Sequence, residues 1–128
     1  KWLDSGKLVI LDRYVSSNKA HMGANLPKNE KEEFIIWLDN LEYRVNDIPG
    51  EDLVIFLYVP YQMSQKNISK EKQDLLEKDL KHQKNAARIY LELAKQKHWV
   101  TINCTKNGKM REKVDIHKEI VDKLNLNS

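Results

Sequence analysis

Three short, largely apolar runs mark the chain at residues 8–11, 53–59 and 99–104. Apolar runs without alternation are typical of strands that are buried on both faces of a parallel sheet. The first run predicts a strand over residues 7–12, and the second predicts a strand that ends before Pro60. Helical patterns separate the runs, and strands alternating with helices favour an α/β fold with a parallel sheet.

The segment after the first run contains small and polar residues, and it predicts a loop up to about Pro27. A helix is predicted over residues 30–45 with Asn29 as its N-cap. The apolar residues of this helix repeat at helical spacing, namely Phe34, Leu38, Leu41 and Val45. Residues 35–37 widen the apolar stripe beyond what one sheet face covers. Either a partner subunit or a loop of the same chain could cover the excess.

The second half predicts three more helical segments. Residues 61–67 favour one or two helical turns, and residues 69–97 a long charged helix capped by Ser69. Its inward stripe is predicted to contain Leu76, Leu80, Ala87, Leu91 and Ala94. After the third strand, residues 105–108 predict a turn, and residues 114–126 predict a closing amphipathic helix.

Composition limits the class of protein. At 128 residues the chain forms at most one domain, and its net charge of +3 is too small and dispersed for a nucleic-acid footprint. No apolar run approaches the roughly 18 residues of a membrane span. The single cysteine, Cys104, cannot form an internal disulfide, which favours a reducing cytoplasm.

Residues 1–6 resemble the tail of a helix capped by Gly6, so the chain is predicted to be a fragment whose missing strands and helix precede Lys1.

Asp12 and Arg13 follow the first predicted strand directly. Ligands of open α/β sheets bind outside the carboxyl ends of the strands, so the pair stands where chemistry usually occurs. An arginine presents a planar fork to phosphate oxygens, and a neighbouring aspartate can hold a metal-bound water. The pair therefore indicates phosphoryl chemistry on an anionic substrate. A local salt bridge or a helix cap is the structural alternative.

Residues 12–23, with the sequence Asp-Arg-Tyr at their start, resemble the substrate loop of thymidylate kinases. The resemblance continues in the same order through residues 52–60, 74–83, 90–94 and 99–104. Glu51 stands where the family usually has proline, and Tyr58 stands where it usually has aspartate. Residues 74–83 and 90–94 match one lid-to-helix passage of the family, so four motifs occur in order, and four in order are more specific than any one of them.

The resemblance implies a P-loop NTPase-like fold of the nucleoside monophosphate kinase type, with a parallel sheet, flanking helices and a truncated N-terminus. The whole of residues 1–128 would be the C-terminal part of one such domain, with the lid at about residues 61–77. The implied reaction transfers the γ-phosphoryl group of ATP to dTMP with Mg²⁺, and gives dTDP for dTTP biosynthesis. A cytoplasmic homodimer is also implied.

The resemblance also assigns roles to the substrate loop. Asp12 would lie near magnesium and the phosphates, and Arg13 would bind the phosphate of the acceptor nucleotide. Tyr14 would shape the site, while Ser17 and Asn18 would lie along the base and sugar.

Two residues of this loop depart from the family pattern. His21 stands where the family has Tyr or Phe against the deoxyribose, and Met22 replaces a common Gln. Both departures leave the selection of base and sugar open, and simple loop packing is the alternative for both.

Outside the substrate loop, the implied site residues form two groups. Lys72, Asp74 and Glu77 match the lid and its phosphate contacts, although exposed helix charges are the simpler interpretation of the two acids. Asn103, Cys104 and Thr105 would lie at the adenine of ATP, with Cys104 a buried thiol rather than a nucleophile. No direct metal ligand is expected.

The chain contains no Gly-x-x-x-x-Gly-Lys-Ser/Thr phosphate loop, and it has four glycines in all. A kinase must hold the donor phosphates, so residues 1–128 alone are predicted to be inactive. A related deoxynucleoside or nucleotide kinase of other base preference is one alternative. A non-catalytic, kinase-derived dimerisation or binding module is the other, and the coding sequence upstream of Lys1 would separate it from an enzyme.

Overall fold

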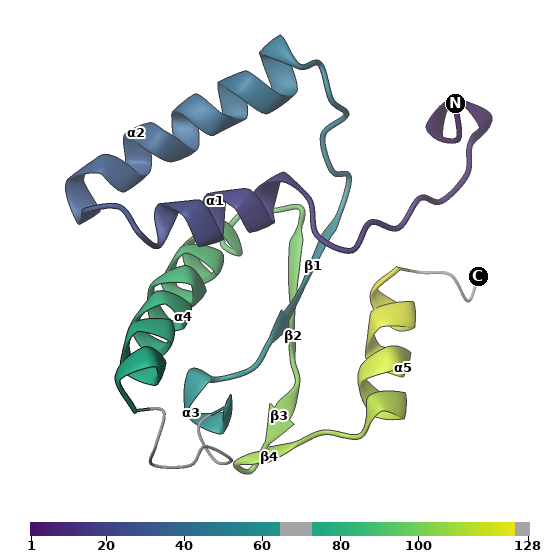
Figure 1. Cartoon of the computed structure of the whole chain (residues 1–128). Coiled ribbons are helices and arrows are strands. Elements are labelled where there is room, and N and C mark those ends of the chain that lie inside the picture. The colour runs from purple at the N-terminus through teal and green to yellow at the C-terminus, as the bar shows by residue number, and fades with distance from the viewer. Residues whose placement is uncertain (65–72, 125–128) are drawn as a thin grey trace.

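The computed structural model describes residues 1–64 and 73–124, and side chains over 1–63 and 79–124. Its helical segments are η1 (Leu3–Ser5), α1 (Val15–Gly23), α2 (Lys28–Asp39), the π-helix η2 (Asn40–Val45), α3 (Tyr61–Ser64), α4 (Gln73–Leu93) and α5 (Lys113–Lys123). Its strands are β1 (Val54–Tyr58), β2 (Trp99–Asn103), β3 (Thr105–Lys106) and β4 (Lys109–Met110). Figure 1 shows α1 lying between α2 and α4.

The strands β1 and β2 form a parallel pair, in register from Val54 opposite Trp99 to Tyr58 opposite Asn103. The backbone N–H of Cys104 extends the ladder by donating to the Tyr58 carbonyl at 2.9 Å. Both strands therefore end at the same edge of the sheet. The second and third predicted strands are confirmed, and so is the parallel character of the sheet.

The predicted strand over residues 7–12 is wrong. Figure 1 shows an irregular segment between η1 and α1, and within the described residues it joins neither sheet. The segment is not buried either, since Leu8, Ile10 and Leu11 are 61%, 79% and 58% exposed. A strand needs a hydrogen-bonded neighbour, and an apolar run does not supply one. The parallel pair instead consists of β1 and β2, with α4 in the connection between them.

The loop predicted after this segment contains a helix, α1, so that prediction is also wrong. Six of its nine residues are buried where α1 packs against α2 and α4, and Ala20 is fully inaccessible to solvent. Gly23 allows the close approach, because a Cβ there would lie 3.0 Å from Cδ1 of Ile89 on α4. Burial of small and polar residues gives α1 no amphipathic pattern, which explains why periodicity missed it.

The predicted helix over residues 30–45 is confirmed as α2 and its continuation η2. It begins at Lys28, directly after Pro27, so Asn29 lies inside the first turn and is not the cap. Leu38 is buried in the core, whereas Ile36 and Trp37 are each 55% exposed.

The long helix predicted over residues 69–97 is confirmed as α4 from Gln73 to Leu93, but its predicted end is wrong because residues 94–97 form a turn. The core lies between α4, α1 and the parallel strands, and its buried members are Ala20, Ala24, Ala86, Ile89, Leu93 and Trp99. The predicted stripe was partly wrong, since Leu91 is 40% exposed. Helix α4 packs on α1 as well as near the sheet, and this second neighbour rotates its buried face. Ser69 and the side chain of Leu76 lie outside the described residues.

The C-terminal part follows the predictions closely. Strands β3 and β4 pair across Asn107 and Gly108, whose φ angles of 53° and 70° are those of a tight hairpin turn. Helix α5 then begins at Lys113, close to the expected start. At the other end, Gly6 has a φ of 70° and its N–H donates to the Leu3 carbonyl at 2.9 Å, which confirms its capping role. Within the described ranges, no helix has the length and apolarity to cross a membrane.

Candidate functional site

Arg13 has an unusual backbone conformation at the entrance to α1. Its φ of 66° lies in the left-handed region, which non-glycine residues seldom adopt and which concentrates at functional sites. Asp12 and Arg13 are both exposed, and they form no ion pair within the described part of the chain. The N-cap of α1 is Tyr14, without a side-chain capping bond. The salt-bridge and helix-cap alternatives are therefore both wrong, and the guanidinium is accessible.

Tyr14 anchors this entrance to a distant loop. Its hydroxyl donates to the carbonyl of Pro49 at 2.9 Å. Burial raises the pKa of Tyr14 above its ordinary value, and the carboxylates of Glu51 and Glu42 raise it further. The phenol therefore keeps its proton, and the backbone of Arg13 is joined to an anchored residue.

Helix α1 separates the other predicted loop residues into two sets. Ser17 is only 8% exposed, and its N–H donates to the Tyr14 carbonyl at 3.0 Å. Asn18 is exposed and Met22 is 52% exposed. Because these two are four positions apart, they lie on one helix face toward solvent. The two predicted base-facing residues, Ser17 and Asn18, therefore differ strongly in accessibility.

His21 is half-buried and faces a residue that the sequence interpretation missed. Its Nδ1 lies 3.4 Å from Nε2 of His82 on α4. The pKa of His21 is lowered, first by burial and then by the charges of Arg13 and His82. No sequence motif marked His82.

A partly buried polar cluster fixes α1 against α2 and η2, and no sequence signal identified it. The Lys19 side chain is 8% exposed and forms an ion pair with Oδ1 of Asp39. Beside it, the Tyr43 hydroxyl donates to Oε2 of Glu51 at 2.6 Å, and the Ser16 hydroxyl donates to Oε1 at 3.3 Å. Burial and the bond to Glu51 raise the pKa of Tyr43 far above its ordinary value.

These contacts line a hollow of about 300 Å³ that also reaches His98 and Trp99, at the amino end of β2. The hollow thus lies at the opposite end of the sheet from the strand termini that α/β proteins use for ligands. We therefore assign the Lys19–Asp39 pair and its neighbours to the support of α1.

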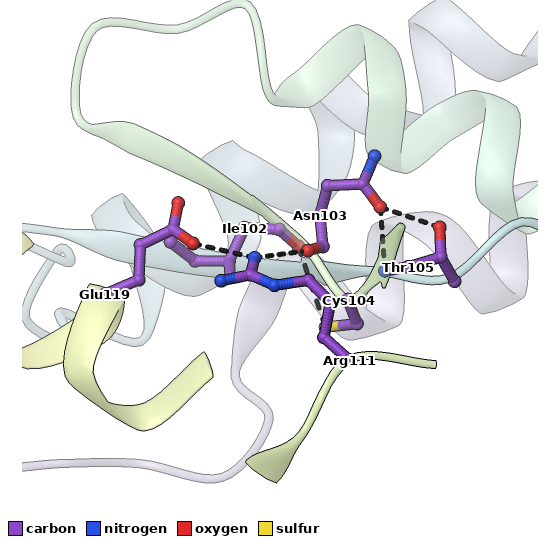
Figure 2. A network of polar contacts seen from close by, with 6 residues as sticks. All are labelled: Ile102, Asn103, Cys104, Thr105, Arg111 and Glu119. Atoms are coloured by element: carbon purple, nitrogen blue, oxygen red, sulfur yellow. Dashed lines mark hydrogen bonds and ion pairs between the residues drawn. The ribbon is translucent and has the colours of Figure 1, made fainter. Parts of the chain in front are cut away.

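Figure 2 shows a second polar network, just beyond the carboxyl end of β2. Oδ1 of Asn103 accepts from the backbone N–H of Thr105 at 3.0 Å and from its hydroxyl at 2.9 Å. Arg111, which the sequence interpretation missed, donates to the Asn103 carbonyl at 2.7 Å and pairs with Glu119 at 2.7 Å. The network holds the β2–β3 junction in one conformation.

Cys104 lies within this junction and is 4% exposed. Burial raises the pKa of its thiol, so the interpretation as a buried, unreactive thiol agrees with the structure. An open hollow of about 680 Å³ adjoins the network, lined by Lys106, Asn107, Lys109, Met110, Arg111, Glu112 and Asp115.

The predicted lid residues are less informative. Lys72 lies outside the described residues, as do the side chains of Asp74 and Glu77, although both belong to α4. Their assignment to the lid stays a prediction.

A parallel strand pair packed with helices places this chain among α/β proteins. A family model described as thymidylate kinase matches residues 1–116, and the chain belongs to the thymidylate kinase family. Family membership implies a P-loop NTPase fold, of which β1, β2 and their helices form a part.

Two curated relatives are both named thymidylate kinase, one from Mycobacterium tuberculosis strain CDC 1551 / Oshkosh and one from strain ATCC 25618 / H37Rv. Each is 30% identical to this chain over 96 residues, which cover 70% of this chain and 45% of the relative. The chain spans about half the length of the curated relatives it matches. No solved structure matches it significantly.

Proposed function

We propose that residues 1–128 form the part of a thymidylate kinase that holds the acceptor dTMP and borders the adenine of ATP, and that the enzyme transfers the γ-phosphoryl group of ATP to dTMP. The observation that carries the proposal is Arg13, an accessible guanidinium held in a left-handed conformation before α1. Family membership and the order of the sequence motifs support the same reaction. The conformation of Arg13 costs free energy that a purely structural residue would not need.

In this proposal the chain contributes orientation and charge. Arg13 holds the phosphate of dTMP with its planar fork, so that an acceptor oxygen lies in line with the transferred group. That oxygen is already nucleophilic at neutral pH, so no strong general base is required. Tyr14 keeps Arg13 in place through its bond to Pro49.

A magnesium ion fits the residues present only in a limited way. Within the described residues, no group of three or more His, Cys, Asp or Glu side chains is placed to hold a metal. Magnesium in kinases needs only one or two carboxylates in addition to substrate phosphates and water. Asp12 is an exposed carboxylate beside Arg13 and would serve as an outer ligand through water. When bound, the ion would neutralise phosphate charge.

The donor end of the site is proposed at the carboxyl end of β2. Asn103 and Thr105 hold this junction rigid, and Lys106, Lys109 and Arg111 surround the adjoining hollow. This location lies outside the carboxyl ends of parallel strands, where nucleotides bind in α/β folds. The adenine of ATP would lie near the junction.

We expect purified residues 1–128 to bind dTMP with a Kd on the order of 1 mM or below. We also expect them to transfer no phosphoryl group. The sequence offers Arg13 for the acceptor but no glycine-rich loop for the donor phosphates. NMR titration measures the binding, and a coupled ADP assay with ATP and dTMP measures transfer. Turnover by residues 1–128 would contradict this division of labour, and absence of dTMP binding would contradict the acceptor site.

A kinase of other base preference is the nearest competing function. The observation that favours it is Met22, which replaces a common Gln of the family and lies exposed on α1 on the same face as Asn18. Titrations with dTMP, dUMP, UMP and thymidine separate the two. We expect dTMP to bind more tightly than thymidine, because Arg13 needs a phosphate. Equal binding of thymidine would favour a nucleoside kinase.

A dimer through α2 is proposed as well. Ile36 and Trp37 are each 55% exposed on one helix, and an exposed apolar patch marks an interaction surface. We expect sedimentation velocity to show a dimer whose dissociation constant rises at least tenfold in Trp37→Lys. Exchange of the exposed Val114 on α5 for Lys is the matched control and should leave the dimer intact. A monomeric wild-type protein would contradict the dimer.

A further inference from the structure

The contact between His21 and His82 is part of a chain of three polar side chains. Nδ1 of His82 lies 2.9 Å from Oδ1 of Asn25, and Nε2 of the same ring lies 3.4 Å from Nδ1 of His21. The three residues come from α1, the turn after it, and α4, which is more than fifty positions away. The chain thus joins the predicted substrate helix to α4.

The contact with Asn25 determines where His82 carries one proton, and it limits how His21 is protonated when His82 is neutral. An amide oxygen only accepts, so Nδ1 of His82 must be the N–H that donates to Asn25. In a neutral His82, Nε2 is then a lone-pair acceptor, and the proton in the contact belongs to Nδ1 of His21. A neutral His21 must therefore carry a lone pair on Nε2.

The environment of His21 keeps it neutral and oriented. Burial, Arg13 and His82 lower the pKa of His21 below the ordinary value, which favours the neutral imidazole. The His21 and His82 rings lie nearly parallel, 25° apart, with centroids 5.6 Å apart, and the His21 ring meets the edge of Tyr90 at 5.9 Å. Two contacts from α4 therefore restrict its rotation.

We propose that His82, oriented by Asn25, is a positioning residue that fixes His21 as a hydrogen-bond acceptor, and that this acceptor selects a donor group on the nucleoside of the acceptor nucleotide. The inference rests on the proposed acceptor site along α1. A tyrosine or phenylalanine at position 21 would offer no such acceptor in its ring, so the pair of histidines changes what the site recognises. The donor is a nucleoside hydroxyl or the base N3–H.

The first test measures protonation directly. Long-range ¹H–¹⁵N spectra of residues 1–128 at pH 7.5 report which ring nitrogen of each histidine is protonated. We expect His21 and His82 both to carry the proton on Nδ1, the tautomer that free histidine disfavours in water. In His82→Leu, His21 should revert to a tautomer mixture. Protonation of His21 on Nε2 in the wild-type protein would overturn the proposal whether or not any nucleotide binds.

The second test measures selection with dTMP, 3′-deoxythymidine 5′-monophosphate and N3-methyl-dTMP, each titrated by NMR. One hydrogen bond corresponds to about 3- to 10-fold in Kd. We expect one analogue to bind the wild-type protein weaker than dTMP by that factor, and His82→Leu to bind dTMP and that analogue equally. The analogue that responds identifies the hydroxyl or the N3–H as the donor. If no analogue loses affinity in a way that depends on His82, the proposal is wrong.

Variants keep the result interpretable. His82→Gln supplies an amide oxygen to accept from His21, so it should restore most of the selectivity lost in His82→Leu, even if the leucine variant folds poorly. His117→Leu, at an exposed position of α5, is the matched control and should behave as wild type. If Arg13→Ala weakens dTMP binding while His82→Leu does not, the further inference alone fails. If dTMP does not bind the wild-type protein, both fail together.

Discussion

Arg13→Ala is expected to lower kcat/KM for dTMP by roughly 30- to 1,000-fold, which is a loss of about 2–4 kcal/mol of transition-state stabilisation. The variant is tested in a protein that contains this chain and phosphorylates dTMP. The guanidinium is accessible and has no competing carboxylate within the described residues, so its full charge is available to the acceptor phosphate. Steady-state kinetics with varied dTMP and saturating ATP measure the effect. NMR titration of residues 1–128 measures the loss in binding alone.

Arg13→Gly separates the side chain from the backbone. Glycine adopts a φ of 66° without penalty, so this variant should lose dTMP as alanine does and yet gain about 1 kcal/mol of stability over Arg13→Ala. Exchange of the exposed Arg44 in η2 for alanine is the matched control and should leave kcat/KM unchanged. If turnover in Arg13→Ala equals that of the wild-type protein, Arg13 lies outside the site.

The parts of the fold that were predictable depend on local signals. The strands at residues 54–58 and 99–103 are continuous β-rich runs, and the turn at Asn107 and Gly108 follows from residues that tolerate positive φ. Helix α2 was visible because its apolar residues repeat at helical spacing. Each of these signals lies within the element itself.

The errors arose where distant contacts decide the structure. The apolar run at residues 8–11 has the composition of a strand, but pairing depends on a neighbour that composition does not reveal. Helix α1 has buried serines and a buried Lys19, which look like a loop until α2 and α4 cover them. The phase of α4 was wrong because α1 also packs on it.

The candidate site divides in the same way. Asp12 and Arg13 were identified from their order after an apolar run and from the family motif, although the expected strand before them is absent from the described structure. His82 and Arg111 could not be identified, because each acts on a residue distant in sequence or through a backbone carbonyl. Sequence motifs indicate which residues contact a ligand. They carry little information on which other residues fix the ligand-contacting side chains in position.

The second large effect is expected at the buried support of α1. Asp39→Asn should lower the free energy of unfolding by about 3 kcal/mol, because it leaves the ammonium of Lys19 buried without a counter-charge. This value is at the low end for buried pairs because the Asp39 side chain is 41% exposed. The ring of Tyr43, 5.6 Å from the ammonium, only partly compensates. A loss of this size is a large fraction of the stability of a typical domain. Urea denaturation followed by tryptophan fluorescence measures it.

Two comparisons show whether burial of the charge is the cause. Adding Lys19→Met to Asp39→Asn removes the unpaired charge and keeps a long, unbranched side chain at position 19. The double variant should therefore be more stable than Asp39→Asn alone. Glu92→Gln breaks the pair with Lys95, whose partners are about 70% exposed, and it should change stability by less than about 0.5 kcal/mol. Because α1 carries Arg13 at its entrance, Asp39→Asn should also weaken dTMP binding in proportion to the loosening of that helix. A loss in Asp39→Asn no larger than in Glu92→Gln would mean that Lys19 reaches water and that the pair does not hold α1.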